Sequence, residues 1–137
     1  MYSRIMVPVD LQHVERLEKA LASAADLAKH YRAEICYVGV TASVAGPVAH
    51  DPEEYGRKLE QFGRAEARKR GVEGTTRAYT SHDPAADLDK VLMRAIEETR
   101  SDLVVMASHL PGLAEHIFAS NAGYLASHAA VSVFVVR

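Results

Sequence analysis

The sequence contains no tryptophan, a single cysteine and no large surplus of either charge. One cysteine excludes an internal disulfide, and because Cys36 lies in an apolar strand pattern we expect a buried thiol rather than a nucleophile. The formal net charge of −2 provides no broad basic surface, so no nucleic-acid partner is expected. No stretch approaches the ~18 apolar residues that span a bilayer, and the first residues form a strand pattern rather than a signal peptide. These absences favour a cytoplasmic protein without membrane insertion.

Motifs of several enzyme classes are also absent. Neither Gly-x-x-x-x-Gly-Lys nor Gly-x-Gly-x-x-Gly occurs, which argues against P-loop hydrolases and dinucleotide oxidoreductases. A Gly-x-Ser-x-Gly elbow for acyl transfer is missing as well. The 7 histidines are scattered without metal-ligand spacing, so no structural metal is predicted. We therefore expect no catalytic residue and favour a protein that is not an enzyme, in which any ATP hydrolysis would be slow and incidental.

Apolar strand patterns alternate with helical patterns from one end of the chain to the other. Strands are predicted at residues 2–9, 33–41, 75–80, 102–107 and 131–136. Helices are predicted at residues 14–31, 52–71, 84–99 and 120–129, the third of them opened by Asp83-Pro84. This alternation predicts one α/β domain over residues 1–137, a doubly wound open sheet of five parallel strands in the order 3-2-1-4-5 with helices on both faces.

In this strand order the first and fourth strands are neighbours, and the winding of the sheet reverses between them. Open α/β sheets bind ligands beyond the carboxyl ends of such strands. Asp10 closes the first strand, and Ser108 and His109 follow the fourth. Asp10 could bind an amino or hydroxyl group of a ligand, or it could cap the next helix. Ser108 and His109 could line a phosphate or ribose site, or they could simply round off the strand end.

A third polar feature, Ser120-Asn121, stands at the predicted start of the last helix. Backbone N–H groups in the first turn of a helix are unpaired and attract anions such as phosphate. The pair could equally serve only as a helix cap. Because the turn after Ser108 leads into this helix and faces Asp10 across the sheet edge, the sequence predicts a nucleotide pocket there.

Motifs along the whole chain match the pattern of one family. They are Ile5-Met-Val-Pro-Val-Asp10, Asp83-Pro84, Asp102-Leu-Val-Val-Met106 and Val133-Phe-Val-Val-Arg137, together with Ala107-Ser-His109, Pro111, Ser120-Asn-Ala122 and His128-Ala129. With these motifs the chain resembles the universal stress protein family, in particular the branch with an Ala-Ser-His-x-Pro turn and a Ser-Asn-Ala helix start. The resemblance implies a regulator or sensor in a stress response that binds an adenine nucleotide, ATP or AMP, with Mg²⁺ accompanying ATP.

The resemblance also implies which residues would contact the nucleotide. Base and ribose contacts would come from Pro8, Val9, Asp10 and Val40, the middle of the site from Ala107, Ser108, His109 and Pro111, and phosphate contacts from Ala119, Ser120 and Asn121. ATP-binding members carry a Gly-x2-Gly-x9-Gly-Ser/Thr signature, and Ala107, Leu110 and Ala119 replace its glycines here. Leu110 cannot compensate phosphate charge, and Ala119 adds a methyl group where the backbone would approach phosphate. We therefore expect a weakened phosphate grip, with AMP binding comparably to ATP.

The last predicted strand lies at an edge of the sheet and is apolar on both faces. Val131, Val133 and Val135 point one way, and Phe134 and Val136 point the other way. Free backbone groups on an apolar edge favour pairing with a second copy, and the resemblance implies dimers through this strand. Residues 131–136 are therefore predicted to form a homodimer interface, while other protein partners are unknown. The alternative function is a dimeric protein-interaction module of the same fold that no longer binds nucleotide.

Overall fold

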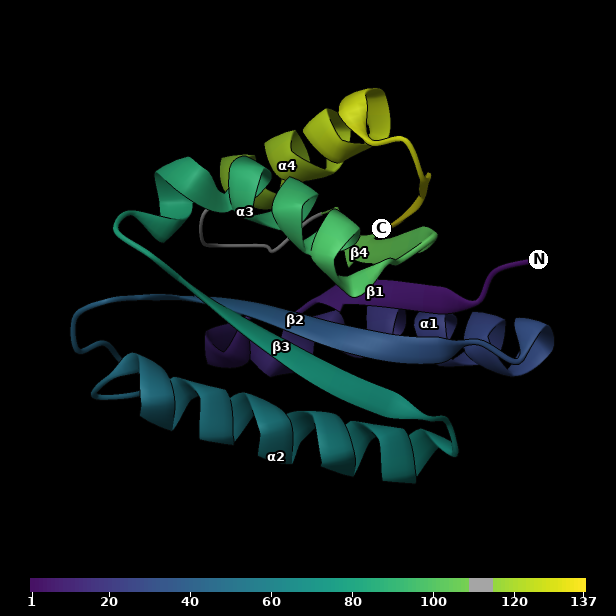
Figure 1. Cartoon of the computed structure of the whole chain (residues 1–137), viewed down its shortest axis with the longest axis horizontal. Helices are drawn as coiled ribbons and strands as arrows, with labels where there is room; N and C mark the ends of the chain where they lie inside the picture. Colours follow the sequence, from purple (N-terminus) through teal and green to yellow (C-terminus); the bar gives the residue numbers. More distant parts are fainter. Residues whose placement is uncertain (109–114) are drawn as a thin grey trace.

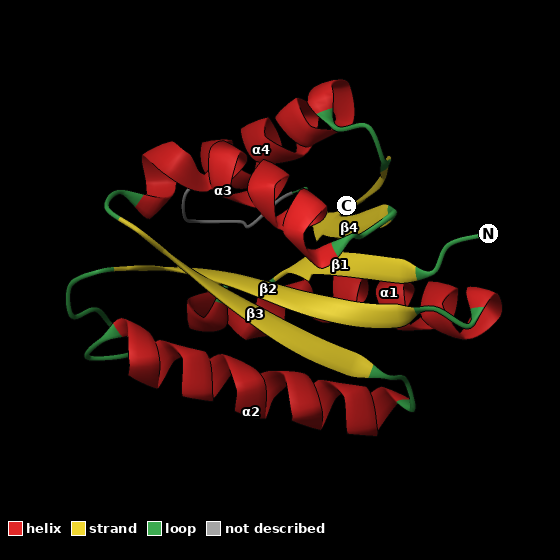
Figure 2. Ribbon diagram, viewed as in Figure 1, coloured by secondary structure: helices red, strands yellow, loops and turns green. Residues whose placement is uncertain are grey.

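The computed structural model describes residues 1–108 and 115–137, with side chains from residue 121 onward in the second range. Its strands form one parallel sheet in the predicted order, β3-β2-β1-β4-β5, and helices cover both faces (Figures 1 and 2). The strands are β1 (Arg4–Pro8), β2 (Glu34–Ala42), β3 (Gly74–Ser81), β4 (Leu103–Ala107) and β5 (Ser132–Val136). The helices are the 3₁₀ helix η1 (Leu11–Leu17), α1 (Glu18–Tyr31), α2 (Pro52–Arg70), α3 (Pro84–Thr99) and α4 (Glu115–His128).

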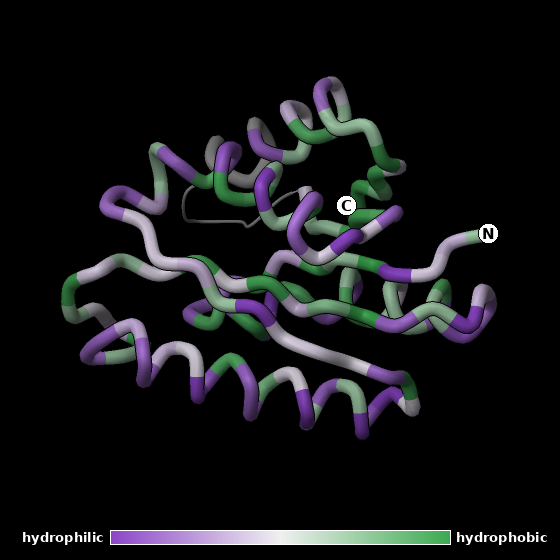
Figure 3. Tube along the Cα trace, viewed as in Figure 1, coloured by the Kyte–Doolittle hydropathy of each residue, from purple (hydrophilic) through white to green (hydrophobic). Residues whose placement is uncertain are grey.

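Each face of the sheet carries its own hydrophobic core, because successive side chains of a strand point to opposite faces. In β1, Ile5 and Val7 pack toward α1 and α2, whereas Met6 packs toward α3 and α4. Figure 3 shows hydrophobic residues concentrated along the central strands and polar residues on the outer sides of the helices. Burial on both faces explains why the central strands are apolar at nearly every position.

The start of α3 follows the sequence prediction. Asp83 caps the helix by accepting a hydrogen bond from the backbone N–H of Ala86 at 3.3 Å, and Pro84 occupies the first turn. A first-turn proline costs no hydrogen bond, because N–H groups there have no partner within the helix. The helix ends at Arg100, which takes a left-handed backbone conformation with φ of 55°.

The segment after β1 differs from the single helix predicted at residues 14–31. The chain first forms η1 and only then α1, and His13 interrupts η1 with φ of −133° and ψ of 45°. Asp10 starts η1 by accepting the backbone N–H of Gln12 at 2.9 Å. The cap initiates a short 3₁₀ turn, and the apolar spacing of α1 begins only after it.

The last helix also begins earlier than predicted. α4 starts at Glu115, whereas the small residues at 119–123 suggested a start near Ser120. Ser and Asn are favoured at helix caps, but they are also tolerated inside a helix when its ends lie elsewhere. Residues 115–120 include neither Gly nor Pro, so nothing in their sequence breaks the helix.

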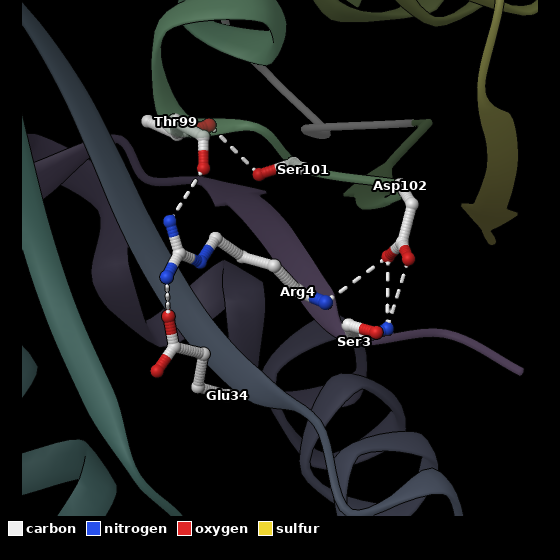
Figure 4. A network of polar contacts seen from close by, with 6 residues as sticks. All are labelled: Ser3, Arg4, Glu34, Thr99, Ser101 and Asp102. Atoms are coloured by element: carbon white, nitrogen blue, oxygen red, sulfur yellow. Dashed lines mark hydrogen bonds and ion pairs between the residues drawn. The ribbon is translucent and has the colours of Figure 1, made fainter.

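A polar network joins the starting ends of β1, β2 and β4, shown in Figure 4. The Asp102 carboxylate accepts the backbone N–H of Ser3 at 2.9 Å and that of Arg4 at 3.0 Å. The Arg4 guanidinium donates to the Thr99 carbonyl at 2.8 Å and forms an ion pair with Glu34. Because these contacts hold the amino-terminal ends of three strands, they fix the sheet at the end opposite the carboxyl-terminal edge where a ligand is expected.

Candidate functional site

The carboxyl ends of β1 and β2 are staggered, and this stagger opens the site. β1 pairs with β2 as far as Pro8 and Val38, and the Val9 N–H donates to the Val38 carbonyl at 2.8 Å. β2 continues to Ala42, paired only with β3 beyond this point. Asp10 therefore leaves the sheet beside the extended end of β2, where Val40 lies.

The backbone of Val40 points into the space that β1 vacates. Within a strand, alternate residues direct their N–H and C=O groups to the same side. Val38 bonds to Val9 on the β1 side, so Val40, two residues further on, directs both groups to that side as well. Since β1 ends at Pro8, this leaves a donor and an acceptor facing the region after Asp10.

A cavity of about 150 Å³ occupies this region. Its walls are the residues that follow β1, the end of β2, the loop over residues 42–49 and Tyr55 of α2. An apolar cavity of roughly this size holds a benzene molecule. The cavity thus accommodates part of a nucleobase, whereas ribose and phosphate groups would extend out of it.

Asp10 serves as a cap and also borders the cavity. Its Oδ1 accepts the Gln12 N–H, and its Oδ2 lies 2.8 Å from Nδ1 of His13. About a quarter of its side chain is exposed, at 26%. The capping alternative is confirmed, and because each carboxylate oxygen has more than one lone pair, capping leaves capacity for a ligand hydroxyl or amino group. His13 holds the carboxylate in one orientation.

Tyr55 is a wall residue that the sequence did not mark as functional. Tyr55, Leu59 and Phe62 have the spacing of an apolar stripe on a helix. This pattern gives no sign that the hydroxyl of Tyr55 has a function of its own. Tyr55 is 4% exposed and lines the cavity. Burial, and after it the negative charge of Asp10, raises the pKa of Tyr55. The hydroxyl therefore keeps its proton at neutral pH and can both donate and accept a hydrogen bond.

Of the residues predicted for the middle of the site, the structure describes Ala107 and Ser108. The Met6–Val104 register sets Ala107, at the end of β4, level with Val9 on the neighbouring strand. The Ser108 N–H donates to the Val136 carbonyl at 2.8 Å, so it is used by β5. His109, Leu110 and Pro111 fall outside the described residues.

The predicted phosphate contacts need a correction. Ala119, Ser120 and Asn121 lie after the first turn of α4, where backbone N–H groups bond to carbonyls four residues earlier. The expectation that they stand at the free amino end of the helix is wrong. Asn121 is 4% exposed and is engaged in an interaction within the fold.

Other groups in the described part of the chain are structural. Cys36 is buried, and burial raises the pKa of its thiol, as expected for a thiol that stays protonated. Across the described residues, no three His, Cys, Asp or Glu side chains are placed to hold a metal ion. None of the described helices is long and apolar enough to cross a membrane.

The strand order and the cavity define a doubly wound open α/β domain with a cavity next to its topological switch point. Residues 1–137 match the model of the Universal stress protein family. The chain is also 30% identical over 145 residues to Universal stress protein G of Salmonella typhimurium, with 100% of both chains covered. The chain therefore belongs to the universal stress protein family.

Solved structures of this family share the fold. One from Burkholderia pseudomallei is 26% identical, with a TM-score of 0.70 over 98% of this chain and 96% of that chain. A universal stress protein in complex with cAMP is 17% identical, with a TM-score of 0.72 over 99% and 97%. A family protein from Arabidopsis thaliana with AMP bound is 17% identical, with a TM-score of 0.63 over 98% and 90%. At such identities the last two similarities show the fold alone.

Proposed function

We propose that this protein is a cytoplasmic regulator or sensor of a stress response that binds an adenine nucleotide. The observation that carries the proposal is the cavity between Asp10 and the end of β2. An adenine presents an acceptor nitrogen beside an amino donor, which complements the N–H and C=O of Val40. Asp10 would accept a ribose hydroxyl at the cavity mouth. Family members whose solved structures contain AMP or cAMP support this choice of ligand.

The phosphate side of the site supports AMP as well as ATP. The cavity accommodates only part of the base, and Ala107 and Ala119 replace signature glycines on the side where phosphates would extend. These replacements are expected to weaken the grip on the second and third phosphates, so AMP binds comparably to ATP. Mg²⁺ would enter with the phosphates of ATP.

Mass spectrometry of the purified protein tests this proposal. The protein is purified without added nucleotide and denatured, and its supernatant is analysed for adenine nucleotides; thermal shift with ATP, ADP and AMP follows. A co-purified nucleotide, or a rise in melting temperature that grows with ligand concentration, is expected. A well-folded protein with neither property contradicts nucleotide binding. An ATP preference of tenfold or more over AMP, about 1.4 kcal/mol, contradicts the weakened phosphate grip.

A protein-interaction module is the second candidate, and β5 is the observation that favours it. On this edge strand Phe134 is 46% exposed and Val135 is 37% exposed. An apolar edge strand pairs readily with another chain, so we propose a homodimer through β5. If no nucleotide binds, this edge remains the functional surface of the domain. Release of phosphate from ATP would be slow in either case.

A further inference from the structure

Tyr55 combines a largely buried side chain with a hydroxyl group that has no hydrogen-bond partner among the described residues. In the same part of the chain, the fully occluded polar side-chain atoms without partners are Nη1 of Arg16, Oη of Tyr37 and Oδ1 of Asp89, and Oη of Tyr55 is not among them. Since Tyr55 lines the cavity, its hydroxyl keeps access to a ligand there.

The hydroxyl lies beside the backbone that we assign to base recognition. A Cβ atom on Gly39 would stand 2.4 Å from Oη of Tyr55, so Oη touches the backbone of Gly39. Val40 is the next residue, and its N–H and C=O face the same cavity. The hydroxyl thus lies close enough to this backbone for both to act on one edge of a planar base.

The protonation state of Tyr55 determines which hydrogen bonds its hydroxyl offers. Burial, and after it the charge of Asp10, raises the pKa of Tyr55, so the hydroxyl stays protonated at neutral pH. Its oxygen then has lone pairs that can accept a hydrogen bond from a ligand in the cavity. A group that fits these lone pairs is a hydrogen-bond donor.

We propose that the Tyr55 hydroxyl is a base-recognition group that accepts a hydrogen bond from the exocyclic amino group of adenine. This inference rests on the proposed nucleotide function and adds the residue that selects an amino-bearing base. The amino group carries two N–H bonds, of which the Val40 carbonyl takes one and Tyr55 takes the other. A purine without the amino group cannot make this hydrogen bond, and an unmade hydrogen bond at a largely buried side chain is costly.

Isothermal titration with two nucleotides and three forms of the protein tests this assignment. The ligands are AMP and purine riboside 5′-monophosphate, which differ only in the amino group. The proteins are the wild type, Tyr55→Phe and the matched control Tyr37→Phe, which also removes a buried unpaired hydroxyl but lies outside the cavity wall. Phe retains the ring in both cases, and a thermal melt verifies folding.

The expected result is a change in selectivity. The wild type binds AMP more tightly than purine riboside 5′-monophosphate. Tyr55→Phe weakens AMP binding about fivefold and leaves the other ligand unaffected, and Tyr37→Phe changes neither. If the wild type and Tyr55→Phe bind AMP with equal affinity, the role of Tyr55 is overturned while the proposed function stands. The same conclusion follows if Tyr55→Phe loses affinity equally for both ligands. A wild type that binds neither ligand overturns the proposed function itself and the inference with it.

Discussion

Gly39 and Tyr55 are in direct contact, and the contact depends on the absence of a side chain at Gly39. A Cβ atom there would lie 2.4 Å from Oη of Tyr55 and 3.1 Å from Cδ2 of Leu59. Gly39→Ala must therefore push Tyr55 out of its position, and overpacking of this kind costs about 1–3 kcal/mol. We expect a lower melting temperature and weaker AMP binding, measured by thermal melt and isothermal titration.

The control for this prediction is Gly56→Ala in α2, where a Cβ atom meets nothing within 4 Å. Alanine favours a helix over glycine by about 0.5–1 kcal/mol, so this variant should be at least as stable as the wild type. Combining Gly39→Ala with Tyr55→Phe removes the shortest contact and should recover part of the lost stability. A Gly39→Ala protein with unchanged stability and binding would contradict the packing argument.

Asp102 anchors the start of β1 at the far end of the sheet from the cavity. Its carboxylate accepts the N–H groups of Ser3 and Arg4, and Asp102→Ala leaves both without a protein partner. We expect a loss of about 1–3 kcal/mol in the free energy of unfolding, measured by urea denaturation. AMP affinity should remain unchanged in the folded variant because the network is remote from Asp10. A parallel loss of affinity would show that the two ends of the sheet are coupled.

Most of the fold could be predicted from the sequence, because its signals are local. The alternation of buried strands with amphipathic helices fixes a parallel sheet, and the preference for right-handed crossovers leaves one simple strand order. Asp83 and Pro84 mark the start of α3 by their own chemistry. The start of α4 differs from the prediction because Ser120-Asn121 is a cap pattern that also occurs within a helix.

The candidate site could be predicted only in part. Asp10 follows from the end of the first strand at the switch point of the sheet, whereas Val40 is implied by the family resemblance. Tyr55 could not be recognised, because its helical spacing with Leu59 is that of a core residue and nothing local shows that its hydroxyl reaches a cavity. Contacts across the fold, such as that with Gly39, depend on the approach of α2 to β2 and have no sequence signature.

Glu18 links α1 to the end of α2 and gives the protein a dependence on pH. Arg70 donates to Glu18 at 2.8 Å, and this hydrogen bond, with the charge of Arg70, lowers the pKa of Glu18. A lowered folded-state pKa stabilises the protein above the ordinary pKa of the group, and the benefit disappears as the pH falls through the lowered value. Glu18→Gln should therefore melt lower than the wild type at pH 7, and the two curves should converge in acid.

The matched control for this prediction is Glu60→Gln, which removes an ion pair with Arg64 within α2. Both carboxylates are exposed, Glu18 at 64% and Glu60 at 53%, but Arg64 is 74% exposed and Arg70 only 11%. Solvent therefore weakens the Glu60 pair more. Thermal melts from pH 3 to pH 8 should show almost no effect of Glu60→Gln. A constant difference between Glu18→Gln and the wild type at every pH would mean that packing, rather than charge, is responsible.

The backbone of β5 allows a substitution that tests the proposed homodimer without disturbing the sheet. Ser108 donates to the Val136 carbonyl, so Val136 and Phe134 direct their backbone groups to β4, and Val135 directs its N–H to the open edge. Proline at an edge strand is tolerated where the missing N–H faces outward. Val135→Pro should therefore still fold, with the thermal stability of a single subunit. Light scattering should show that it is a monomer. Phe134→Pro should instead unfold, because it breaks the ladder to β4. A Val135→Pro protein that remains a dimer would locate the interface elsewhere.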